Sequence, residues 1–151
     1  MYNNLAWEKI WCSLECLKEP RLKALQFKLL HQIYPTGVLL CKMGKRETNK
    51  CIYCNDHDVL DDYEHFFIKC KNICTVWQVI NNMVSQKYDC NIKLTCDQIL
   101  TGVHCMQKHR NYFINNIISV GKNTISKFKY GKYPNVEHLL ETELKLRKML
   151  M

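Results

Sequence analysis

Apolar residues recur at helical intervals along most of the chain. Two stripes of this kind come first: Trp7, Trp11, Leu14 and Leu17, then Leu22, Leu25, Leu29 and Ile33. Pro20 suits the first turn of the second helix, where a missing N–H costs little. Thr36 can cap a short third helix, which Gly44 can end. The first 44 residues therefore predict three helices.

The same periodicity predicts four further helices after a polar loop. Their expected ranges are 63–84 with a break near Asn72, a short helix capped by Thr95 or Asp97, 110–130, and 136–150. In the long one, the residues expected inward are Tyr112, Phe113, Ile117, Ile118, Ile125 and Phe128. The last should carry the i,i+4 pairs Glu141–Lys145 and Glu143–Arg147. No strand-like alternation is persuasive. We expect a mainly α fold: a small helical domain over 1–84, built around an irregular loop that carries cysteines and histidines, and a helical C-terminal extension over 85–151.

Composition limits the class of protein. The chain has 151 residues, of which 47% are hydrophobic and 24% charged, as in globular domains. No apolar run approaches the roughly 20 residues that span a bilayer, and MYNNLAWEKIW lacks the apolar core of a signal peptide. We therefore expect an intracellular protein of the nucleus, the cytoplasm or both, not secreted and without a membrane partner. Its ten cysteines should then be reduced, and some are better interpreted as ligands than as disulfides.

The net charge of +8 is unevenly distributed. Residues 1–50 carry nine Lys and Arg against four acids, and 101–151 carry nine against three. The central segment, 51–100, carries four against seven. A basic excess of this size favours a polyanionic partner.

A metal site is predicted at CIYCNDHDVLDDYEHFFIKC, residues 51–70. Cys51, Cys54, His65 and Cys70 have the spacing C-x2-C-x10-H-x4-C. Three thiolates and one imidazole are a common ligand set for tetrahedral zinc, and four protein ligands leave no open position. We expect one structural Zn²⁺ whose binding is coupled to folding of the loop.

Other candidates fit less well. His57 or Cys74 could replace one ligand in a different arrangement, whereas Cys12 and Cys16 suit a helix core. We interpret Asp61-Asp62 as solvated loop, because no neighbouring strands supply a second acid for two-metal chemistry. No nucleophile–base pair, phosphate loop or open metal site is present, so no enzymatic activity is expected of this segment.

Several motifs follow one another in a set order from Trp7 to Trp77. They are Trp7 and Trp11, PRLKALQFKLLHQIYPT, Leu39 and Leu40, Gly44, CIYC, Glu64-His65-Phe66-Phe67, Cys70 and Trp77. In order and spacing this stretch resembles the zinc-binding domain C-terminal to the reverse transcriptase of non-LTR (long interspersed) retrotransposons. The resemblance implies the ligands Cys51, Cys54, His65 and Cys70, the same four that spacing selects.

The resemblance also implies a function. The family's parent polyprotein holds an endonuclease and an RNA-directed DNA polymerase, and the zinc domain is implied to hold element RNA or target DNA near the polymerase. No polymerase motif is present here, which makes the chain a fragment, a decayed copy or a domesticated remnant. The alternative function is a zinc-structured protein-interaction module that docks on the polymerase, with the acidic loop 55–64 facing a basic neighbour.

Candidate phosphate contacts flank the metal loop. They are Lys42, Lys45, Arg46, Lys50, Lys69 and Lys71, with a second group of Lys122, Lys127, Lys129 and Lys132. RNA or DNA would be bound with low sequence specificity. The aromatic residues Trp7, Trp11, Phe66, Phe67 and Trp77 lie on apolar stripes and are expected in the core rather than on a stacking surface.

Overall fold

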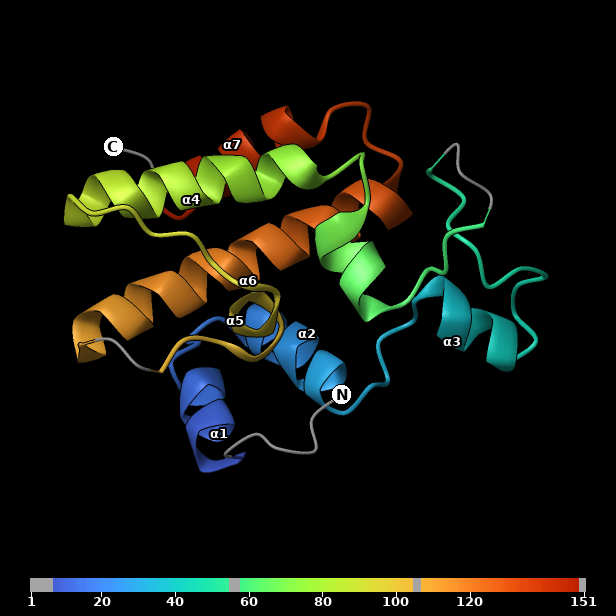
Figure 1. Cartoon of the computed structure of the whole chain (residues 1–151), viewed down its shortest axis with the longest axis horizontal. Helices are drawn as coiled ribbons and strands as arrows, with labels where there is room; N and C mark the ends of the chain where they lie inside the picture. Colours follow the sequence, from blue (N-terminus) through green and yellow to red (C-terminus); the bar gives the residue numbers. More distant parts are fainter. Residues whose placement is uncertain (1–6, 55–57, 105–106, 150–151) are drawn as a thin grey trace.

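The computed structural model describes residues 7–54, 58–104 and 107–149 and consists of helices packed around one long helix (Figure 1). In chain order the elements are α1 (Trp7–Glu15), α2 (Pro20–Leu30), α3 (Gly37–Lys42), the π-helix η1 (His65–Lys69), α4 (Cys74–Tyr88), α5 (Cys96–Thr101), α6 (Lys108–Gly131) and α7 (Val136–Leu146). Within the described ranges no residue belongs to a β-strand. The predicted mainly α class is confirmed.

Helix α6 is the axis of the fold. Figure 1 shows α4 and α7 along one side of it and α1, α2 and α5 along the other, with α3 and the segments 43–54 and 58–64 at one end. Direct contacts join α6 to α1, α2, α4 and α7. Every residue from Ile117 to Ile125 is buried. A helix enclosed in this way is usually apolar all round, yet α6 buries several polar side chains.

One glycine sets how closely α4 approaches α6. A Cβ atom at Gly121 would lie 2.5 Å from Cδ1 of Ile80 and 3.2 Å from ring atoms of Trp77. A larger residue would require the Ile80 and Trp77 side chains to shift, so the close packing of these side chains on α6 favours glycine at this position.

The helix-start signals and the predicted pairs of the last helix are confirmed. Pro20 is the first residue of α2, and the Thr36 hydroxyl accepts the Leu39 N–H at the start of α3. Thr95 and Gln98 form a capping box at α5. The pairs Glu141–Lys145 and Glu143–Arg147 form at 2.6 Å each.

Several boundaries differ from expectation. The predicted break near Asn72 is confirmed, because a turn at 71–73 separates η1 from α4, but α4 extends to Tyr88 and does not end near residue 84. The last helix ends at Leu146, and Leu150 lies outside the described residues.

The predicted core is wrong at the edges of α1 and α2. Trp7, Trp11 and Ile33 are exposed to 44%, 37% and 55%. Cys12 and Tyr112 are also exposed, and Cys16 is half-buried. Leu14 and Leu17 of the predicted stripe are buried, and Ile10 and Ser13 join them in place of Trp7 and Trp11. Both stripes have helical periodicity, and the one that includes Ile10 and Ser13 faces α2 and α6. Phe66, Phe67 and Trp77 are buried as predicted.

Residues of both predicted units, 1–84 and 85–151, contribute to one core cluster. The division itself stays a prediction. Among the described residues, the helices are too short or too polar to cross a bilayer.

Lys122 lies in a polar pocket inside this core. Its Nζ donates to Oε1 of Gln26, whose Nε2 donates to the Leu100 carbonyl at 2.9 Å. Ser13, Asn115 and Ser119 line the same cavity of about 10 Å³, which is the size of one water molecule. Burial lowers the pKa of Lys122 from 10.5 to about 7. The earlier interpretation of Lys122 and Lys129 as phosphate contacts is wrong, because both side chains are 1% exposed.

The lowered pKa of Lys122 predicts a pH dependence of stability. Between about pH 7 and 10.5 the unfolded chain binds a proton at Lys122 that the folded chain does not, so the free energy of unfolding should rise with pH across this window. Lys122→Met should make the slope shallower by about one proton. Urea denaturation of reduced protein at several pH values measures this slope. Lys108→Met, an exposed position of the same helix, should keep the wild-type slope; equal slopes in all three proteins would contradict the prediction.

Candidate metal centre

A short antiparallel contact closes the loop that carries the first two ligands. Lys50 bridges to Leu60, the Cys51 N–H donates to the Val59 carbonyl at 2.8 Å, and the Asp61 N–H donates to the Asn49 carbonyl at 2.9 Å. The two ends of the loop are therefore held together by backbone hydrogen bonds. The alternative ligand His57 lies outside the described residues.

The second pair of ligands lies at the two ends of η1. The Cys70 N–H donates to the His65 carbonyl at 2.9 Å, which is the i→i+5 hydrogen bond of a π-turn. Five residues along an α-helix would separate two side chains by about 140° around the axis. The wider π-turn brings the side chains of His65 and Cys70 toward one point. The N–H of His65 donates to Oδ1 of Asp62 at 2.8 Å, which anchors the start of the turn.

The four predicted ligands converge. One ligand atom from each of Cys51, Cys54, His65 and Cys70 lies within 4.8 Å of every other, and all four residues are buried. The Cys54 Sγ is 3.5 Å from His65 Nε2 and 3.6 Å from Cys70 Sγ. Tetrahedral Zn²⁺ with Zn–S of about 2.3 Å and Zn–N of about 2.0 Å requires separations of about 3.5 Å and 3.8 Å. These two separations match those of a tetrahedral site, and the predicted ligand cluster could hold one metal ion.

The protonation of these groups also fits a metal site. Burial raises the pKa of Cys51 to about 11. For Cys70 burial acts in the same direction but is outweighed by Lys129 and by hydrogen bonds from Asn72 and Cys54, so its pKa is lowered. Burial and then Lys129 lower the pKa of His65, which favours the neutral ring that binds metals. Three buried thiols can all ionise only with a cation among them.

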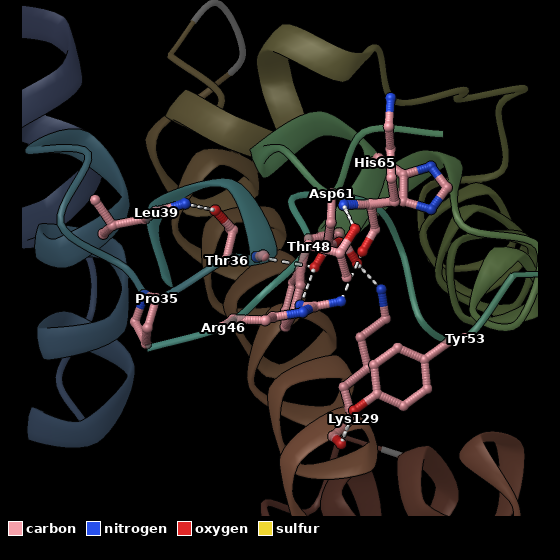
Figure 2. Close-up of polar contacts among 12 residues, drawn as sticks. Pro35, Thr36, Leu39, Arg46, Thr48, Tyr53, Asp61, His65 and Lys129 are labelled. Carbon is pink, nitrogen blue, oxygen red and sulfur yellow. Dashed lines mark hydrogen bonds and ion pairs between the residues drawn. The ribbon is translucent and has the colours of Figure 1, made fainter. Parts of the chain in front are cut away.

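A buried ion pair fixes the loop to α3 (Figure 2). Oδ2 of Asp61 accepts the Gly37 N–H at 2.9 Å and an Arg46 Nη1 hydrogen bond at 3.2 Å, while Arg46 Nη2 donates to the Lys50 carbonyl at 2.6 Å. Asp61 is 1% exposed, so the interpretation of this residue as solvated is wrong; Asp62 is exposed as expected. A Cβ at Gly37 would lie 2.6 Å from both partners, which explains the glycine.

Contacts from α6 complete the surroundings of the cluster. The hydroxyl of Tyr53 donates to the Lys129 carbonyl, and Lys129 Nζ donates to the Phe66 carbonyl at 2.9 Å (Figure 2). Asn72 Nδ2 donates to the Tyr53 carbonyl at 2.6 Å and lies 3.8 Å from the Cys70 Sγ. Residues adjacent to the ligands are thus joined to the central helix.

The structure places the predicted nucleic-acid contacts in two groups. Lys42, Lys45, Lys69 and Lys71 are exposed, and Lys69 pairs with Glu64 at 3.0 Å. Arg46 and Lys50 are half-buried. Arg46 is occupied by Asp61, and Lys50 Nζ donates to the Asp58 carbonyl at 3.3 Å. Contact with nucleic acid stays a prediction for all six.

The alternative ligand Cys74 is exposed and outside the cluster. Sequence reasoning missed the roles of Asp61, Arg46 and Lys129. The sequence does contain a pattern that predicts burial of Lys129. Its position continues one inward helical stripe with Ile118, Lys122 and Ile125.

Comparison with known proteins adds no relative: no family model, no curated protein and no solved structure matches the chain.

The cluster predicts one metal ion per chain. Cys54→Ala and His65→Ala should each abolish stoichiometric binding, because three remaining ligands cannot close the site. Elemental analysis of protein purified under reducing conditions measures the ratio. Cys74→Ala removes a neighbouring thiol outside the cluster and should keep the metal. Full metal content in Cys54→Ala would show that the ligand set is wrong.

Asp61→Asn should lower the free energy of unfolding by about 2 kcal/mol, because Arg46 loses its charged partner. Urea denaturation of the metal-loaded proteins tests this. Glu47→Gln makes the same chemical change at an exposed position and should alter stability by less than about 0.5 kcal/mol. Equal effects of the two substitutions would exclude a structural role for the Asp61 charge.

Proposed function

We propose that the chain is a zinc-stabilised module that binds nucleic acid and performs no chemistry itself. The observation that carries the proposal is the convergence of four buried ligand atoms within 4.8 Å of one another. Three cysteines and one histidine as ligands suit Zn²⁺ better than the oxygen-seeking Mg²⁺ or Ca²⁺. With all four positions taken by protein, the ion supplies structure rather than an activated water.

The chain's own residues give the ion its structural effect. The ligands join the 49–61 loop to η1, and η1 is joined to α4 through the indole N–H of Trp77, which donates to the Phe67 carbonyl at 2.5 Å. Holding the loop in place also fixes the lysines on either side of it. Lys42 and Lys45 come from the segment before the first ligand, and Lys71 directly follows the last one.

Electrostatics support a polyanionic partner for this surface. The chain carries a net charge of +8, and Lys42, Lys45, Lys69 and Lys71 are exposed around the loop. Lysines on a folded scaffold bind phosphates through release of condensed counterions, without reading the bases. We therefore propose RNA or DNA, bound with low sequence specificity.

The resemblance of residues 7–77 to the zinc-binding domain of non-LTR retrotransposon reverse transcriptases agrees with this function. In that setting the module would hold element RNA or target DNA beside the polymerase portion of the parent protein. Reduced thiol ligands require a reducing compartment, which supports an intracellular location in the nucleus or cytoplasm.

A second candidate function is docking on the polymerase portion. The exposed aromatic group on α1 and α2 favours it: the rings of Trp11 and Phe27 lie 5.8 Å and 4.2 Å from that of His31, and Trp7 is exposed on the same helix as Trp11. Exposed apolar surface of this kind is typical of protein interfaces.

A salt titration distinguishes the two functions. Binding of fluorescently labelled single-stranded RNA should weaken with rising salt, with a log–log slope of about −0.7 per phosphate contact. The triple variant Lys42→Gln, Lys45→Gln, Lys71→Gln should reduce the magnitude of that slope by about two.

The matched control changes Lys9, Lys23 and Lys28, three exposed lysines of α1 and α2, to Gln. It carries the same net charge as the first triple variant but should keep most of the slope. Equal losses in both would indicate attraction by net charge alone. A wild-type protein without measurable binding at low salt would favour docking.

A further inference from the structure

Helix α6 buries a second lysine, Lys129, whose surroundings differ from those of Lys122. Both side chains are 1% exposed. Lys122 faces the neutral amide of Gln26. Lys129 Nζ donates to the Phe66 carbonyl at 2.9 Å and lies 4.3 Å and 5.5 Å from the ring centroids of Phe66 and Tyr53. A carbonyl oxygen and two ring faces stabilise a charged ammonium.

A charged Lys129 requires an anionic counterpart, because an unpaired buried charge costs several kcal/mol. Three other cations in the C-terminal half of the chain have carboxylate partners: Lys127 and Arg147 pair with Glu143 at 2.5 Å and 2.6 Å, and Lys145 pairs with Glu141 at 2.6 Å. Among the described ion pairs none includes Lys129. Among the described residues, its counterpart is therefore a group other than a carboxylate.

The metal centre has the required position and charge. Phe66 directly follows the ligand His65, and Tyr53 lies between the ligands Cys51 and Cys54. Figure 2 shows the Lys129 side chain extending from α6 toward the segment that carries His65. A divalent ion bound by three thiolates and one neutral imidazole leaves one net negative charge. The same lysine acts electrostatically on Cys51, Cys70 and His65.

We infer that Lys129 is the counter-charge of the metal centre: its buried ammonium neutralises the excess thiolate charge and joins the metal loop to α6. The inference rests on the metal centre proposed above. It makes Lys129 a positioning residue, acting on the ligands through charge and through the Phe66 carbonyl. It also means that tight metal binding depends on a helix that begins 38 residues after the last ligand, at Lys108.

The test compares two buried lysines of one helix. Lys129→Met should weaken Zn²⁺ binding by about tenfold or more, as expected for loss of a group that supports metal ligands. Lys122→Met removes an equally buried lysine that contacts no residue next to a ligand, and should change the affinity by less than about threefold. Competition with a chromophoric chelator measures both constants.

A double-mutant cycle separates charge from packing. Cys51→His converts the ligands to two cysteines and two histidines, a set that zinc also uses, and leaves the centre neutral. If Lys129 acts as a counter-charge, adding Lys129→Met to the Cys51→His variant should weaken Zn²⁺ binding by less than about threefold, because the centre no longer carries a net negative charge. An undiminished loss would indicate packing alone and overturn the inference.

The remaining outcomes are also decisive. If Lys129→Met alone does not fold, recovery of zinc binding and helicity on adding Cys51→His supports the counter-charge, and failure to recover them overturns it. Unchanged affinity in Lys129→Met overturns the inference but leaves the metal centre intact. A wild-type chain that binds no zinc would remove the metal centre itself.

Discussion

Three buried thiols and a buried imidazole, gathered within 4.8 Å, are the constraint on which the rest of this structure depends. If these thiols ionise, they repel one another without hydration, so the ionised cluster would require a cation among them. The two ends of the intervening segment are held by backbone hydrogen bonds, by the Arg46–Asp61 pair and by the ligand cluster.

The polar interior of α6 follows from its central position. A helix covered by four others normally contributes only apolar side chains, but this one places two lysines among them. Burial lowers the pKa of Lys122, which donates to the side-chain amide of Gln26. Lys129 is surrounded by groups that stabilise a positive charge and lies beside the proposed metal centre, where a positive charge would balance the thiolates. The same residue type thus serves two different electrostatic purposes seven positions apart.

Local features of this chain were predictable, and features that depend on distant contacts were not. Helix positions followed from apolar spacing and from caps such as Thr36 and Thr95, and the ligands followed from their own spacing. The burial of Ile10 in place of Trp7 and Trp11 did not follow, because both choices continue to Leu14 at helical spacing and only packing decides between them. Burial of Asp61 depends on Arg46, 15 positions earlier in the chain. The π-turn differs from an α-turn by one hydrogen-bond step, for which composition offers no signal.

That π-turn restricts how the chain can change in length. Its five-residue step places His65 and Cys70 on one point, and an insertion or deletion between them would rotate one ligand by roughly a quarter of a turn or more. On the other side, from Val59 to His65, backbone pairing and the Asp61 contacts fix the register with similar strictness. Descendants of this sequence can therefore replace most side chains of the 59–70 segment more readily than they can add or remove a single residue.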